Sequence, residues 1–536
     1  MGLFSWWQQG EQEPASADLR TRRPGEKGVS IYEHVAAHAA ADAPGLLPGG
    51  ERLPDEAVAA RRAAVAAGRE EPSVEPLVVL LRTYCQAPSG ENLRAVYEHV
   101  VRHPVLKQAG ELFDALLAAE RPPADRLHAL AHTFATEGGD REPVKLGILL
   151  LGLFRRSDDL PILRTLGRHD EFTRYAATAL TNCVPNGEEE VWALAQEVRG
   201  WGRIHLVKRL LASKNPRIRN WLLREGFRNT VKAEQLALQC AAAGGLRETL
   251  SAEQVDEALL TSVGELLLAL LGRDRAKAAI DQYRHAVEAV ERYLVHLESH
   301  PPSVSHFLAV SAILAFATDS SGPSAARAKR GWTQPRRDAI EARCRAYLKR
   351  PEWPAVIRTA LAAKDDAALS AAERVAAMLR LTTWETHWKH LCEAAESPVR
   401  WRAVIAQCPD GHLTQVVAVA ESRLPLKDLA REAEATDALA RHQACLAAVL
   451  KAVARTPGLG HELLKVGLRC PLDEARAAAA EALHRWGPEF FPQELRHTVG
   501  FAASVEPVPS IRKAMKALLA VEKGRANPAE RGGKPH

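Results

Sequence analysis

The sequence predicts an all-α protein in which many short helices stack in a line. The chain has 536 residues, which is too long for one ordinary hydrophobic core. Alanine, leucine and arginine dominate, and long segments lack the β-branched and aromatic alternation that strands need. Apolar residues instead recur at i, i+3 and i+4 in short segments that begin with acids, Asn or Pro and end with small residues. A short helix with one apolar stripe cannot bury it alone, so neighbours of the same kind must pack on it.

Composition indicates a soluble, folded protein. Apolar residues make up 46% of the chain and charged residues 26%. The net charge of +5 is small for this length, so polyanion binding would depend on a local patch. The 8 cysteines are scattered singly without a CxxC pair, which predicts buried free thiols. We find no secretory signal, and the longest uncharged apolar run, residues 307–318, is shorter than the roughly 20 residues that cross a bilayer. We therefore expect a cytoplasmic protein without a transmembrane segment.

Residues 197–229 form the most informative stretch. The apolar spacing predicts two short helices, at residues 203–212 and 216–225, each with one buried stripe. Asn215 stands where an N-cap belongs and Pro216 where the first helical position belongs. Gly226 can take the left-handed conformation that ends a helix.

The opposite face of this stretch is rich in arginine and is the best candidate for a binding surface. Arginine can grip phosphate or carboxylate, and an indole can stack on a base or a guanidinium. The candidate binding residues are Trp201, Arg203, His205, Arg209, Arg217, Arg219, Trp221 and Arg224. The alternative is that arginines at equivalent positions pair with acids of the adjacent repeat, and Arg174, Arg217, Arg400 and Arg476 fit that pattern.

In chain order, we expect five parts. Residues 1–30 form a flexible segment whose Phe4, Trp6 and Trp7 either dock on the protein or contact a membrane or partner. Residues 31–317 form an N-terminal helical-repeat array, with early helices near residues 74–86, 90–102, 106–119 and 124–136. Residues 318–337 form an exposed basic loop rich in Ser, Gly and Pro. Residues 338–521 form a C-terminal array, and residues 522–536 a disordered tail.

A loose pattern, D/P-x-x-φ-R-x-A-φ-x-A-L, recurs along the chain. Its clearest copies contain Asp473, Arg476, Ala478, Ala479 and Leu483, then Arg174, Ala176, Ala177 and Leu180. This pattern resembles the second helix of HEAT and armadillo-type repeats. The resemblance implies an α-solenoid, a superhelical stack of antiparallel helix pairs, that binds a partner on its concave face.

Motifs that would carry catalysis are missing from the sequence. Residues 200–202 and 458–460 begin a dinucleotide pattern but lack its third glycine, and no phosphate loop or nucleophile elbow occurs. His387, His390, Cys392, Cys408 and His412 fit no zinc spacing, and we interpret them as ordinary helix residues. Iron-dependent hydroxylases of the deoxyhypusine type carry several His-Glu pairs, whereas one pair, at residues 461–462, occurs here. We expect no metal or cofactor.

A second resemblance covers about thirty residues. The segments GWGRIHLVKRL and IRNWLLREG, residues 200–210 and 218–226, resemble a block in bacterial proteins labelled limonene hydroxylase. That resemblance implies oxygen chemistry, which needs haem, flavin or iron. The sequence offers no haem-thiolate motif, flavin fold or facial triad for it.

The preferred hypothesis is therefore a non-catalytic HEAT-repeat scaffold that binds a protein or other macromolecular partner through a concave, locally basic face. A nucleic-acid-binding or nucleic-acid-processing solenoid is the first alternative, and an oxygen-using enzyme is the second.

Overall fold

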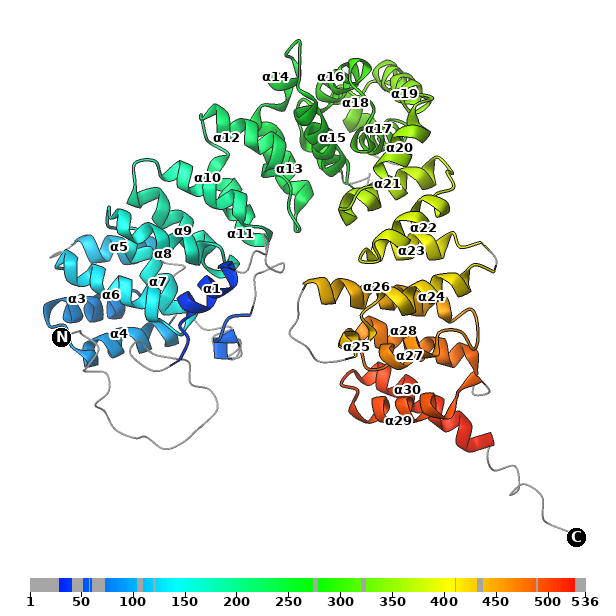
Figure 1. The fold of residues 1–536 in the computed structure, drawn as a ribbon. Helices are drawn as coiled ribbons and strands as arrows, with labels where there is room; N and C mark the ends of the chain where they lie inside the picture. Colours follow the sequence, from blue (N-terminus) through cyan, green and yellow to red (C-terminus); the bar gives the residue numbers. More distant parts are fainter. Residues whose placement is uncertain are drawn as a thin grey trace, which may run out of the picture. The chain divides into compact units, whose positions relative to one another are not determined.

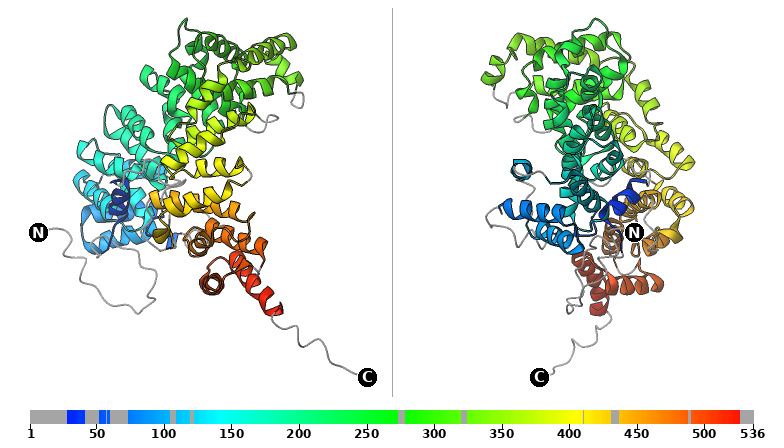
Figure 2. Two further views of the ribbon diagram at one scale, coloured as in Figure 1. Left: turned by 45° about the vertical axis from the view of Figure 1, so that its right-hand side comes forward. Right: turned by 90° about the vertical axis from the view of Figure 1, so that its left-hand side faces the viewer.

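The chain is all-α in a computed structural model, which describes residues 28–40, 52–56, 58–59, 73–103, 109–118, 122–272, 278–319, 324–409, 411–430, 437–487 and 490–525. These residues form helices and connecting segments and contain no strand (Figures 1 and 2). None of the described helices combines the length and apolar character needed to cross a membrane. The aromatic residues Phe4, Trp6 and Trp7 lie outside the described residues, as do residues 526–536 of the predicted tail.

Two compact units make up the chain. Unit 1 contains residues 1–299 and 312–344, and unit 2 contains residues 300–311 and 345–536. Helices α17 (Val304–Ala317) and α19 (Gln334–Leu348) each include a boundary between the units.

Unit 1 consists of short helices joined by short connections. They are α1 (Ile31–Ala40), α3 (Glu75–Gln86), α4 (Gly90–Arg102), α5 (Ala109–Ala118), α6 (Ala124–Glu137), α7 (Arg141–Leu151), η3 (Ser157–Asp159), α8 (Leu160–Gly167), α9 (Asp170–Cys183), α10 (Gly187–Glu197), α11 (Gly200–Leu210), α12 (Pro216–Trp221), η4 (Leu222–Gly226), α13 (Ala233–Gly244), α14 (Leu246–Leu250), α15 (Glu257–Leu271), η6 (Ala279–Gln282), α16 (Ala286–Ser299) and α18 (Ser324–Lys329).

Packing in unit 1 follows the chain order. Helices α7, α9, α11, α13 and α15 contact one another in that order and form one row. Helices α6, α8 and α10 each pack against the helix that follows them, so that pairs recur along the chain. Helix α1 departs from this order, because it packs against α6 and α8, where Ile31 and Val35 are buried.

Unit 2 repeats the same arrangement. Its helices are α20 (Trp353–Ala360), α21 (Asp366–Met378), α22 (Trp384–Glu393), α23 (Pro398–Ala406), α24 (Leu413–Arg423), α25 (Leu426–Leu429), α26 (Asp437–Val453), α27 (His461–Gly467), α28 (Asp473–Trp486), α29 (Gln493–Val505) and α30 (Pro509–Arg525). Helices α21, α23, α26, α28 and α30 form a row. Helices α20, α22, α24 and α29 each pack on one member of it, and α27 packs on both α26 and α28. The core between them is aliphatic and alanine-rich, with Trp401 fully buried in it.

The central stretch forms the two predicted helices with a different ending. The Asn215 side chain accepts a hydrogen bond from the backbone N–H of Arg217 at 3.0 Å, which confirms the predicted N-cap. The predicted left-handed ending at Gly226 is wrong, since its φ is not positive and the chain instead widens into the π-helix η4. Gly226 is needed for close packing, because an added Cβ would lie 3.0 Å from Leu222 and 3.3 Å from the sulfur of Cys240.

Two other expectations have direct outcomes. All 8 cysteines are free, and six are buried, which confirms the thiol prediction. Residues 318–337 are not a continuous loop, since α18 and the start of α19 lie within them. Arg327 in this segment is 4% exposed and pairs with Asp281, Nη2 to Oδ2, at 2.9 Å. Its guanidinium carbon lies 4.1 Å from the ring centroid of Phe316, which holds the segment against the helices. That this segment separates two arrays stays a prediction.

Candidate functional site

The segment Gly200-Trp201-Gly202-Arg203 starts α11 and organises the central stretch. The carboxylate of Asp170, the first residue of α9, accepts hydrogen bonds from the backbone N–H groups of Trp201 at 3.0 Å and Gly202 at 2.6 Å. These amides belong to the first turn of α11, where N–H groups lack partners within the helix. Asp170 therefore caps α11 from the neighbouring helix. Gly202 permits this approach, because an added Cβ would lie 2.6 Å from the hydroxyl of Thr173.

A second side chain fixes the same segment from the other direction. The Asn229 side-chain oxygen accepts from the N–H of Gly200 at 2.8 Å, and its side-chain nitrogen donates to the carbonyl of Gly200 at 2.9 Å. Gly200 has φ +76°, a conformation that glycine adopts at little cost. The start of α11 is thus hydrogen-bonded on both sides of Trp201.

Arg203 is buried and does not belong to the surface. Its side chain is 1% exposed and lies over the ring of Trp221, which is itself 7% exposed. The guanidinium donates to the carbonyls of Ala195 at 2.9 Å, Val198 at 3.3 Å and Glu225 at 2.5 Å. Burial, with a smaller effect of the nearby Arg199, lowers the pKa of Arg203 to about 10. It therefore remains a cation at neutral pH, held by carbonyls at the ends of α10 and η4.

Three more of the predicted binding arginines have partners inside the molecule. Arg217 lies 5.0 Å from the ring centroid of Trp192, and Arg219 donates from Nε to the carbonyl of Ala243 at 3.2 Å. Arg224 pairs with Asp256, from Nη2 to Oδ2, at 2.5 Å. Five of the eight predicted binding residues therefore contact rings, carbonyls or carboxylates of the chain, namely Arg203, Arg217, Arg219, Trp221 and Arg224, although Arg217 remains exposed.

Arginines bind helix ends throughout the chain. The last carbonyls of a helix lack backbone partners and carry partial negative charge, which suits a guanidinium. Arginines that donate to carbonyls at or just beyond a helix C-terminus are Arg82 (α5), Arg126 (α3), Arg203 (α10), Arg219 (α13), Arg337 (α17), Arg400 (α20) and Arg512 (α29). Arg476 of α28 also pairs with Glu506, which directly follows α29 in the next helix pair, at 2.7 Å, as predicted for a contact between repeats.

The remaining predicted residues lie on one side of α11, where Trp201 and Arg209 are exposed and His205 is half-buried. Trp201, His205 and Arg209 are spaced by four residues, and Lys208 adjoins them. Arg209 donates from Nη2 to the hydroxyl of Thr178 on α9 at 2.5 Å, one turn beyond Arg174. We call these five residues, Arg174, Trp201, His205, Lys208 and Arg209, the α9–α11 surface.

Positive charge on the α9–α11 surface is not neutralised. Arg174, Lys208 and Arg209 are exposed, and none of them has an acidic partner in the described part of the chain. Burial, followed by the charges of Arg174 and Lys208, lowers the pKa of His205, which is therefore neutral at pH 7. Burial and Arg174 likewise lower the pKa of Arg209. Such crowding of like charges favours an anion from outside the molecule.

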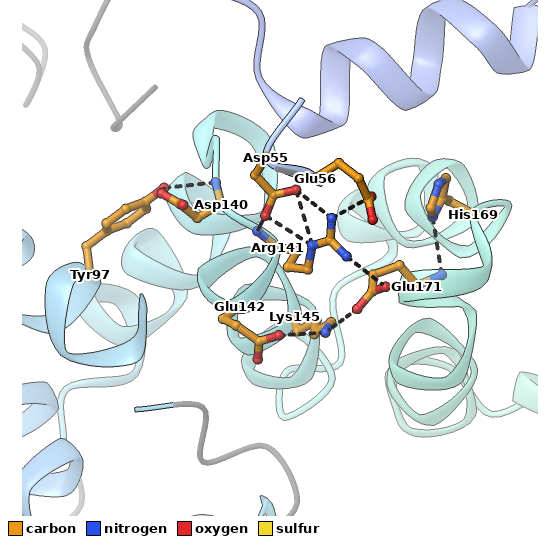
Figure 3. A network of polar contacts seen from close by, with 9 residues as sticks. All are labelled: Asp55, Glu56, Tyr97, Asp140, Arg141, Glu142, Lys145, His169 and Glu171. Carbon is orange, nitrogen blue, oxygen red and sulfur yellow. Dashed lines mark hydrogen bonds and ion pairs between the residues drawn. The ribbon is translucent and has the colours of Figure 1, made fainter. Parts of the chain in front are cut away.

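A neighbouring network shows the opposite arrangement, in which each cation has an acid (Figure 3). Arg141 at the start of α7 pairs with Asp55 at 3.0 Å, Glu56 at 2.8 Å and Glu171 at 3.3 Å. Asp55 is 1% exposed and also accepts from the backbone N–H of Arg141 at 2.9 Å.

The same network continues along α7. Lys145 pairs with Glu142 at 2.7 Å and also contacts Glu171. Burial would raise the pKa of Glu171, but Lys145 and Arg141 outweigh it, and the pKa is lowered. These pairs attach residues 52–56 to α7, and both cations are paired with acids inside the molecule, so neither is available to an external anion.

The three histidines considered as metal ligands contact other side chains of the protein. His387 is buried and contacts Glu373, while His390 lies 3.2 Å from Glu393. His412 packs edge-on against Trp384, with ring centroids 5.2 Å apart. No group of three or more His, Cys, Asp or Glu side chains that could hold a metal occurs among the residues that the structure describes.

Comparisons with known proteins add no further assignment. The chain matches no protein-family model, and a search of curated proteins gave no significant match.

Lys208 was not among the binding residues predicted from the sequence, and Arg174 was predicted to contact the adjacent repeat. The spacing of Lys208 from His205 on one helix could have identified it. Arg174 could not be assigned to the surface without knowing that α9 packs beside α11.

Proposed function

We propose that the chain is a non-catalytic scaffold of the HEAT-like solenoid class that binds an acidic macromolecular partner through the α9–α11 surface. Support for the class comes from the repeated helix pairs in each unit and from Arg476, Ala478, Ala479 and Leu483, whose contacts fit the repeat signature. The observation that carries the binding proposal is the cluster of three exposed cations without acids. Most other arginines of this region contact carbonyls, rings or carboxylates, so the cluster differs from the arginines around it.

The experiment compares two double variants with the same change in net charge. Arg174→Glu/Arg209→Glu reverses the α9–α11 surface, whereas Arg358→Glu/Arg374→Glu reverses two exposed arginines of α20 and α21. We expect the first variant to elute from immobilised heparin at a clearly lower salt concentration than wild type, and the second to elute close to wild type. Equal elution of the two variants would show that only net charge matters and would remove the proposal.

A further inference from the structure

Trp201 is exposed although its backbone is firmly held. It is 48% exposed, whereas the other tryptophans in the described part of the chain are buried or half-buried. Its own N–H donates to Asp170, and the adjacent Gly200 exchanges two hydrogen bonds with Asn229. An exposed indole on a fixed backbone offers a flat apolar face, and binding to it does not require the backbone to be ordered.

The indole and the cations lie on one face of the same helix. Positions 201, 205, 208 and 209 are i, i+4, i+7 and i+8, which places them on one side of α11. At 1.5 Å per residue, Trp201 and Arg209 are about 12 Å apart along the helix axis. Arg174 widens the charged end of this stripe onto α9, next to the Thr178–Arg209 hydrogen bond.

This combination of groups matches one class of polyanion best. Exposed arginine and lysine side chains bind phosphate, and an indole stacks on any nucleobase whose face is accessible. In a duplex the base faces are covered by neighbouring pairs, so that Trp201 would gain nothing from it. An acidic peptide would pair with the cations, but it would cover the indole only if it carried an apolar side chain at the right spacing. A single strand offers a phosphate and an accessible base in every nucleotide.

We propose that the α9–α11 surface binds single-stranded nucleic acid, with Trp201 stacked on a base and Arg174, Lys208 and Arg209 on the phosphates. This inference rests on the proposed function and adds the chemical class of the partner.

The test uses the full chain and a fluorescein-labelled 15-nucleotide oligothymidylate or oligouridylate, with binding followed by fluorescence anisotropy. We expect Trp201→Ala to weaken binding roughly 5- to 150-fold, because stacking is worth about 1–3 kcal/mol per base. Trp201→Phe retains an aromatic face and should recover much of that loss. Trp201→Ala should elute from heparin together with wild type, since heparin has no base to stack.

The cations are tested by salt dependence. Each lost phosphate contact should reduce the slope of log K against log salt by about 0.7 for a single strand. Arg174→Ala/Arg209→Ala should therefore reduce the slope by about 1.4. Arg358→Ala/Arg374→Ala serves as the matched control and should leave the slope unchanged.

Several results would overturn the inference, and they are separable from failure of the proposed function. If wild type binds heparin or polyglutamate but no oligonucleotide at low salt, the inference is wrong and the proposed function stands. Binding of a duplex of equal length as tightly as the single strand, or unchanged binding by Trp201→Ala, also overturns it. If the chain is not retained by heparin and also binds no oligonucleotide in the anisotropy measurement, both proposals are wrong.

Discussion

The adjacent buried residues Gly202 and Arg203 both fix the position of α11, one by lacking a side chain and the other by having a long one. The missing side chain of Gly202 lets Asp170 reach the first amides of α11, and the long side chain of Arg203 reaches the ends of α10 and η4. Both residues therefore fix α11 between its neighbours. Their effect on binding is indirect, because the indole of Trp201 takes its position from the backbone that they hold.

Replacing Gly202 tests this packing. In Gly202→Ala the new Cβ would lie 2.6 Å from the hydroxyl of Thr173 and 2.7 Å from Oδ1 of Asp170, so that α11 must move away from its cap. We expect a loss of about 1–3 kcal/mol in the free energy of unfolding, measured by thermal denaturation. Gly500 in α29 is the control, because nothing lies within 4 Å of an added Cβ. Gly500→Ala should be neutral or stabilising by up to about 1 kcal/mol, and equal effects of both substitutions would contradict the packing argument.

A single residue also illustrates what the sequence could not reveal. Arg203 and Arg209 have the same side chain on the same short helix, yet Arg203 is 1% exposed and Arg209 is exposed. Helical spacing separates their faces, but an arginine is not expected in the interior. The carbonyls that hold Arg203 come from residues 195, 198 and 225, and their convergence depends on how three elements pack.

At the scale of helices, the spacing of apolar residues predicts where a helix occurs better than it predicts the residues at which the helix begins and ends. The helices expected at residues 90–102 and 124–136 appear as α4, with the same limits, and as α6, which ends at Glu137. The expected start of the third early helix, at residue 106, falls outside the described residues, and α5 is described from Ala109. Local propensity does not predict the π-helix η4, in which the carbonyl of Glu225 accepts a hydrogen bond from Arg203 of α11.

The first turn of α17 contains a buried histidine, His306, whose protonation should affect the stability of the fold. His306 is fully buried, and burial lowers its pKa to about 4. The unfolded chain binds a proton near pH 6.5, whereas the folded chain does so only near pH 4. The neutral form therefore contributes stability that is complete above pH 6.5 and is lost as the pH falls toward 4.

The measurement compares wild type with His306→Gln, which stays neutral. We expect the difference in unfolding free energy, from urea denaturation, to be constant above about pH 6.5, to fall by about 3 kcal/mol toward pH 4, and to level off below that. Other acids titrate in both proteins and cancel in the difference. A difference that does not vary with pH would mean that His306 is not kept neutral by burial.

At the scale of the whole molecule, two units of all-α structure reuse one packing scheme. The all-α class was predicted from the sequence and is confirmed, since the segments that the structure describes contain helices and no strand. The candidate surface could be predicted only in part, because the sequence does not distinguish arginines that make contacts within the chain from arginines that remain exposed. Most arginines near the centre contact helix ends, rings or acids within the chain, and a few remain on the α9–α11 surface.

That division of arginines is the central claim, and it is tested by two variants that each remove one positive charge. The measurement is the salt concentration at which folded Arg203→Met and Arg209→Met elute from immobilised heparin, below the melting temperature of each. We predict that Arg209→Met elutes at lower salt than wild type. Arg203→Met should elute with wild type while melting earlier, because buried carbonyls lose their donor at a cost of roughly 1–3 kcal/mol. An elution shift for Arg203→Met as large as that for Arg209→Met would contradict the account.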